Sequence, residues 1–222
     1  SDAAVNVTGN ITVDAAQTAL VIADDKSVVS ADTNAINVVI ANNTILGGNA
    51  ATIDRASIIA GGDTAVTART EGSILANVAS EVQASTSVGI VLAFNTIGYA
   101  PADLFHATVD ALGGNANSDS SYVASKAIIR DSSLDVTGSL TVTSDWAGSV
   151  IAVIESAALA LKVNVGNSND DATSVTVAPI IALNKISSRT EARIIGLSNK
   201  ADNTIGGDVT VHAVGTSGRA HV

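Results

Sequence analysis

The sequence predicts an all-β fold and, within that class, a parallel β-helix, which is a solenoid of stacked strands. Three observations favour it: a short motif returns at intervals, apolar and polar residues alternate with a period of two, and only 2% of residues are aromatic although 46% are hydrophobic. Repetition at a fixed period is typical of stacked architectures, and period-two alternation with many β-branched residues is typical of strands. A narrow solenoid interior holds layers of aliphatic side chains, which fits the scarcity of aromatic residues.

Each repeat opens with a glycine that precedes a polar residue and an alternating segment. The four glycines are Gly9, Gly62, Gly138 and Gly207, and the segments 10–15, 63–68, 139–144 and 208–213 follow them. A second motif, in which alanine is followed two residues later by asparagine and four residues later by isoleucine, recurs between them. Its asparagines are Asn43, Asn95 and Asn184. We predict that these glycines and asparagines occupy equivalent turn positions in successive repeats.

The spacing of these motifs separates a basic repeat from two insertions. Gly9 and Gly62 are 53 residues apart, and Asn43 and Asn95 are 52 apart, so the imperfect repeat is about 52 residues long. The longer spacings that follow place one insertion at about 98–121 and a second at about 165–174. Insertions into solenoids form surface loops while the repeats keep their register. We therefore expect residues 1–222 to form a single solenoid segment of a longer repetitive chain.

The number of apolar runs in one repeat predicts five or six strands. Since a three-sided coil uses three strands, one repeat would make about two coils and advance roughly 10 Å along the axis. On that geometry Asn43, Asn95 and Asn184 are too far apart to touch, and each is expected to satisfy its own turn. We also expect Ile181 to face the interior.

Composition and charge exclude several classes of function. The chain has no cysteine, which excludes disulfides and thiolate metal sites. Its net charge of −10 argues against binding to nucleic acid, which depends on lysine and arginine contacts with phosphates. No apolar run approaches the roughly 18 residues of a membrane-spanning helix, so we expect no membrane insertion. Both ends of the sequence fall inside repeats and neither resembles a cap, so we expect neighbouring repeats or further copies to stack there.

Paired carboxylates are the candidate metal ligands. They are Asp24 and Asp25 in one polar loop, and Asp170 and Asp171 in another. Such pairs could contribute to a Ca²⁺ site, which takes about six to eight oxygen ligands. The alternative is a solvated loop, because a sufficient set of ligands is not visible around either pair. We expect no other cofactor.

The sequence shows no catalytic constellation, so we expect no enzymatic activity. His106 lies in the first insertion and His212 and His221 lie near the C-terminus, and neither a nucleophile elbow nor a phosphate-binding loop is present. The first insertion is rich in aromatic residues, and Tyr99 and Phe105 are candidate contacts for a partner. One alternative is therefore a carbohydrate-binding or carbohydrate-active β-helix that uses the face near this insertion. Another is that the insertion is a flap over an apolar edge.

Three motifs resemble those of a known class of surface protein. They are Gly-Gly-Asp-Val-Thr-Val-x-Ala at 206–213, the segment 127–134, and Ile-Ala-Leu-Asn-x-Ile at 181–186. They are similar to the giant bacterial β-strand-repeat surface proteins, the filamentous-haemagglutinin-like and leukotoxin-like adhesins. The resemblance implies a right-handed β-helical stalk that is secreted, lies at the bacterial cell surface, and serves in adhesion or in extracellular fibres. The family supplies no catalytic residue. The partners we expect are neighbouring repeats or copies of the chain, with host or matrix glycans as further candidates.

Overall fold

The computed structural model describes residues 3–98, 122–160, 175–197 and 203–221. These residues form β-strands joined by turns, and all the strand pairings among them are parallel. None of the described residues forms a helix that could span a membrane. The predicted all-β fold, with parallel strands in stacked sheets, is therefore confirmed.

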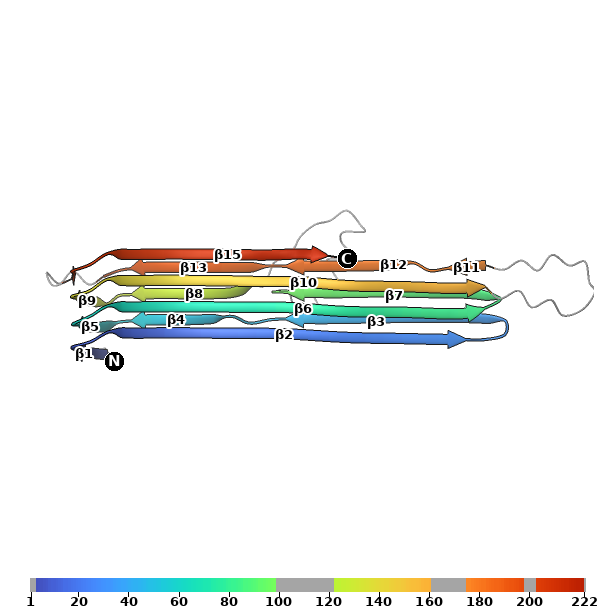
Figure 1. Cartoon of the computed structure of the whole chain (residues 1–222), viewed down its shortest axis with the longest axis horizontal. Coiled ribbons are helices and arrows are strands. Elements are labelled where there is room, and N and C mark those ends of the chain that lie inside the picture. Colours follow the sequence, from blue (N-terminus) through green and yellow to red (C-terminus); the bar gives the residue numbers. More distant parts are fainter. Residues whose placement is uncertain (1–2, 99–121, 161–174, 198–202, 222) are drawn as a thin grey trace, which may run out of the picture.

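The strands form four sheets that run along one elongated body (Figure 1). The long sheet contains β2 (Ile11–Ser30), β6 (Thr64–Ala84), β10 (Leu140–Ala160) and β15 (Val209–His221). The distal return sheet contains β3 (Asn34–Ile45), β7 (Thr86–Ile97), β11 (Val175–Val177) and β12 (Ile180–Ile186). The proximal return sheet contains β4 (Asn49–Asp54), β8 (Val123–Arg130) and β13 (Ser188–Ile195). The end sheet contains β1 (Ala3–Val7), β5 (Ala56–Ala60), β9 (Ser133–Val136) and β14 (Thr204–Ile205).

Each repeat makes one circuit of these sheets. The chain runs out along the long sheet, returns through the distal and then the proximal return sheet, and passes through the end sheet to the next circuit (Figure 1). Thr64 of β6 pairs with Ile11 of β2, and Asn95 of β7 pairs with Asn43 of β3. The predicted two coils per repeat are therefore wrong, and one repeat advances by a single strand spacing of about 4.8 Å.

The pairing register places both predicted insertions between strands. Ile97 pairs with Ile45 and Ser125 pairs with Asn49, so the first insertion falls between β7 and β8. The second falls between β10 and β11. The predicted ranges 98–121 and 165–174 lie in these two connections, and apart from Gly98 their residues are outside the described part of the chain.

Side chains alternate between the interior and the outer face along the strands. In β6 every second residue is buried, including Val66, Ile74 and Val78, which are at most 1% exposed. These residues pack in aliphatic clusters against the return sheets. In the distal return sheet Val91 faces this interior at 0% exposure, whereas Ile181 pairs with the next residue, Leu92, and is 43% exposed. The prediction that Ile181 faces the interior is therefore wrong. Its neighbour Ile180 pairs with the interior-facing Val91, and adjacent residues of a strand point to opposite faces.

The one tryptophan is accommodated in the interior by a neighbouring glycine. Trp146 lies within β10, is 1% exposed, and packs among Ile74, Ile97 and Val150. A Cβ atom on Gly148 would lie 2.4 Å from the indole ring, so a side chain at this position would displace it. The indole therefore fills space that a larger residue two positions along the strand would occupy.

Candidate functional site

The three motif asparagines form a hydrogen-bonded ladder across successive circuits. Asn43 Nδ2 donates to Asn95 Oδ1 at 2.8 Å, and Asn95 Nδ2 donates to Asn184 Oδ1 at 2.9 Å. Asn95 is 0% exposed, so these bonds lie in the interior. The prediction that the asparagines cannot touch is wrong, because it rested on two coils per repeat. The ladder can form only when equivalent residues are one strand spacing apart.

The motif glycines form a second ladder at the start of each circuit. Gly62 N donates to Gly9 O at 3.1 Å, and Gly138 and Gly207 continue the series with bonds of 3.1 and 2.9 Å. The polar residue after each glycine reinforces it: Asn10 Oδ1 accepts from Asp63 N, and Asp63 Oδ1 accepts from Ser139 N, both at 2.8 Å.

Glycine is required in this row because the circuits approach closely. A Cβ atom on Gly62 would lie 2.1 Å from Asn10 Oδ1, and one on Gly138 would lie 2.2 Å from Asp63 Oδ1. The predicted equivalence of these turn glycines agrees with the observed bonding. Each circuit therefore presents a side-chain acceptor and a carbonyl to the circuit that follows it.

A third row of equivalent residues has a left-handed backbone. Arg55, Asp131 and Gly196 have φ values of 48°, 50° and 61°, and each directly follows a strand of the proximal return sheet. Arg55 N donates to Arg130 O, and Asp131 N donates to Ile195 O, both at 3.0 Å. Sequence reasoning missed this turn because glycine, the usual signal, occurs in only one of the three circuits.

The candidate calcium ligands Asp24 and Asp25 do not converge. The prediction that Asp24 and Asp25 lie in a loop is wrong, because both lie within β2. Consecutive residues of a strand point to opposite faces. Asp24 accepts a hydrogen bond of 3.0 Å from Asn77 Nδ2, whereas Asp25 pairs with Val78 in an interior-facing row. Asp170 and Asp171 lie outside the described residues.

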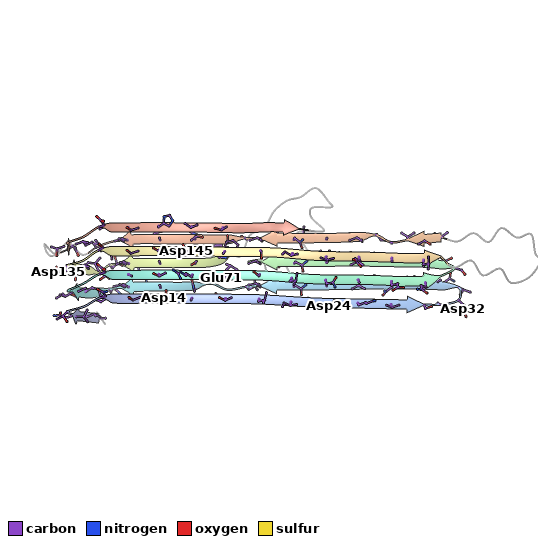
Figure 2. The ribbon with its side chains drawn as sticks, in the orientation of Figure 1. Asp14, Asp24, Asp32, Glu71, Asp135 and Asp145 are labelled. Carbon is purple, nitrogen blue, oxygen red and sulfur yellow. The ribbon has the colours of Figure 1, made fainter. Side chains whose placement is uncertain are left out.

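Acidic residues elsewhere are also dispersed. Figure 2 shows Asp14, Asp24, Glu71 and Asp145 spread over three strands of the long sheet, with further labelled carboxylates at the two ends of the body. Among the described residues, no group of three or more His, Cys, Asp or Glu side chains is placed to hold a metal ion.

The candidate partner contacts Tyr99 and Phe105 lie outside the described residues, as does His106. Where the chain rejoins the fold after the first insertion, Tyr122 is 42% exposed, and the Arg189 guanidinium lies 5.6 Å from the centre of its ring. His212 is exposed on β15 and pairs with Thr143 of β10.

A shallow hollow of about 250 Å³ lies on the long sheet, and the sequence did not indicate it. Polar side chains from three strands line it, namely Glu71, Ser73, Ser149 and Thr216. Ser73 Oγ and Ser149 Oγ are 3.2 Å apart and share a hydrogen bond. Two small residues of β10, Ala147 and Gly148, complete the lining. It offers one carboxylate and several hydroxyls to a small polar ligand.

The outer face of the proximal return sheet carries ion pairs. Arg130 and Asp54 are cross-strand neighbours and form a bidentate pair, with N–O distances of 3.0 and 2.8 Å. The hydrogen bond from the Arg130 guanidinium lowers the pKa of the Asp54 carboxyl below its ordinary value of 3.8. On β13, Glu191 pairs with both Arg189 and Arg193. The Asp54–Arg130 pair links two strands, whereas both pairs of Glu191 lie along the single strand β13.

The two terminal circuits differ from the middle ones in how well their interior rows are covered. In β10, Leu140 and Val142 are 0% exposed, whereas their neighbours in β15, Val209 and Val211, are 53% and 47% exposed. The interior-facing residues of β2 are likewise only half-buried. In the described part of the chain, β2 and β15 are the edge strands of the long sheet. Both ends of the stack therefore present apolar side chains and an unpaired strand edge.

No protein-family model matches the chain, and neither a curated protein nor a solved structure matches it.

Proposed function

We propose that this chain is a structural segment of a secreted bacterial extracellular fibre or adhesin stalk, folded as a right-handed parallel β-helix. Its function would be length, stiffness and display, without catalysis. The observation that carries the proposal is made in the described part of the chain, where no circuit covers Val209 and Val211 at one end of the stack or the half-buried residues of β2 at the other. Unpaired strand edges are templates for further strands.

The ladders support the same proposal. The glycine ladder and the asparagine ladder each repeat the same bond from circuit to circuit, which is the bonding of a regular stack. At one end of the series, Asp208 N donates a hydrogen bond of 3.2 Å to Ser139 Oγ, and the carboxylate of Asp208 is exposed on the last described circuit. A stack of this kind gains nearest-neighbour contacts with every circuit, which suits a stiff filament.

Electron microscopy of the purified chain tests the proposal. We expect filaments of uniform width that lengthen with protein concentration. Ile11 N donates to Asp63 O, so by alternation the N–H of Ala16 points to the open edge of β2. Ala16→Pro should therefore shorten the filaments without unfolding the chain, whereas Ala16→Val, which keeps the N–H, should not. Discrete particles of fixed length at all concentrations would contradict the proposal.

The same experiment decides whether calcium takes part. Filaments are grown with calcium and then treated with EDTA. Fraying in EDTA would indicate that carboxylates such as Asp24 join circuits through the ion, and unchanged filaments would leave them as solvated side chains.

A second function, glycan binding, rests on a different observation, the polar hollow on the long sheet. Glu71 and the hydroxyls of Ser73, Ser149 and Thr216 could hydrogen-bond a sugar. Binding on a glycan panel that Glu71→Gln abolishes would support this function. An absence of binding across the panel would count against both this hollow and the face near 98–121.

A further inference from the structure

One outer face of the molecule is apolar and almost without charge. It is formed by the outward residues of the distal return sheet, and we call it the apolar face. On β3, Ile36, Val38 and Ile40 are 69%, 51% and 62% exposed, and on the opposite side of β7, Val177 and Ile181 are 46% and 43% exposed. The outward residues of β7 lie between them, and Leu92 pairs with both Ile40 and Ile181.

The apolar face differs from the other outer faces in charge. Across β3, β7, β11 and β12 the one charged residue is Lys185, near the end of β12. The proximal return sheet carries the Asp54–Arg130 and Glu191–Arg193 pairs on its outer face. Because the whole chain has a net charge of −10, most of its surface repels a second copy, and the apolar face does not.

We propose that the apolar face is a lateral interface that pairs with the same face of a second copy of this chain. Two flat sheets pack face to face about 10 Å apart, and their side chains interdigitate best when the rows have the same spacing. A second copy supplies that spacing, because its outward side chains also recur at every second residue along a strand and at every strand across the sheet. Contiguous exposed apolar patches of this kind mark interaction sites.

The size of the face sets the strength of pairing. Three strands of about 12 residues cover roughly 570 Å² of sheet, given about 3.3 Å per residue and about 4.8 Å between strands. A stable interface buries about 800 Å² per partner. This chain should therefore pair weakly and reversibly, and each further circuit would add roughly 190 Å² to the same face. Lateral pairing of long stacks then becomes strong through repetition.

Single cysteines test the geometry, because the chain has no cysteine of its own. Leu92→Cys places a thiol at the centre of the apolar face, and Leu75→Cys places one on the outer face of β6, an inner strand of the long sheet, where Leu75 is 44% exposed. A short bismaleimide should link two Leu92→Cys chains and should not link two Leu75→Cys chains. End-to-end stacking would bring both positions equally close to their copies, so equal linking at both would overturn the lateral interface.

Sedimentation velocity over a range of concentrations tests the energetics. We expect the triple variant Val38→Thr, Ile40→Thr, Ile181→Thr to weaken dimerisation about ten-fold or more by removing apolar contact. The matched control is Leu20→Thr, Ile22→Thr, Ile151→Thr, whose residues are 63%, 68% and 46% exposed on the long sheet. It should dimerise like the parent. An equal loss in both triples, or a parent chain that stays monomeric because another segment covers the face, would overturn the proposal.

Discussion

At the scale of single residues, the interior asparagines determine which circuits can be neighbours. An amide is both donor and acceptor, so Asn95 bonds to Asn43 on one side and to Asn184 on the other. A slip of one residue would turn the shifted amides to the outer face and break the hydrogen bonds of the ladder. The ladder thus contributes to register as well as to stability.

Asn95→Ala should destabilise the chain by about 1–2 kcal/mol, because it removes both hydrogen bonds of the ladder, the one from Asn43 and the one to Asn184. Asn42→Ala is the control, because Asn42 precedes the ladder residue Asn43, is exposed, and accepts one hydrogen bond from Thr44. Denaturant unfolding measures both. A change of similar size in the two variants would show that the ladder adds nothing beyond an exposed bond.

Arg55 lies in a left-handed conformation that glycine adopts without a steric penalty. Arg55→Gly should stabilise the chain by about 0.5–1 kcal/mol, because relief of about 1–2 kcal/mol of backbone strain exceeds the entropic cost of glycine. The control is Arg69→Gly, which also loses an exposed ion pair of 3.8 Å but lies within β6. That variant should be destabilised, and the difference between the two unfolding free energies isolates the backbone term.

The Asp54–Arg130 pair predicts a dependence of stability on pH. Because the pKa of Asp54 is lowered in the folded state, its contribution is present above the ordinary pKa of 3.8 and is lost as pH falls through the lower folded pKa. Asp54→Asn should therefore melt below the parent at neutral pH, and the gap should close in strong acid. Thermal melts at a series of pH values measure this gap. A gap that is constant with pH would exclude the ion pair as its cause.

At the scale of elements, the sequence predicted the repeat spacing, the parallel strands and the places of both insertions, because these follow from motif distances. It did not predict strand length. The predicted count of five or six strands per repeat treated Val66 and Ile74 as parts of two strands, yet both belong to the single strand β6, which continues through Gly72 without a turn. The exposure of the apolar face also could not be predicted, because β3 carries apolar residues on both sides and such a run is typical of a fully buried strand.

Adjacent residues of β7 provide the test of which face is interior. Val91→Asp should destabilise the chain by about 4 kcal/mol, because it buries a carboxylate with no partner in an aliphatic cluster. Leu92→Asp, one residue along and on the outer face, should cost less than about 1 kcal/mol. Circular dichroism melts compare the two. Similar losses would mean that the distal return sheet is covered on both sides.

At the scale of the whole molecule, the open ends compete with features that protect them. Charged residues in the interior-facing row of an edge strand discourage further strands from pairing. Asp25 is such a residue: it pairs with Val78, a member of the cluster that includes Val39 and Val91, and it is exposed only because no circuit covers β2 in the described part of the chain. Association at this end is therefore expected to be weaker than the apolar rows alone would give.

Asp25→Val should have two effects on the molecule. It extends the aliphatic row of Val78 and so should stabilise the chain by about 1 kcal/mol. It also removes a carboxylate that an incoming circuit would have to bury, so filaments should form at lower protein concentration. Asp24→Val is the control, because Asp24 faces outward and loses its bond from Asn77. Light scattering and electron microscopy measure the filaments, and a stabilised Asp25→Val chain that assembles no more readily than the parent would show that growth does not occur on β2.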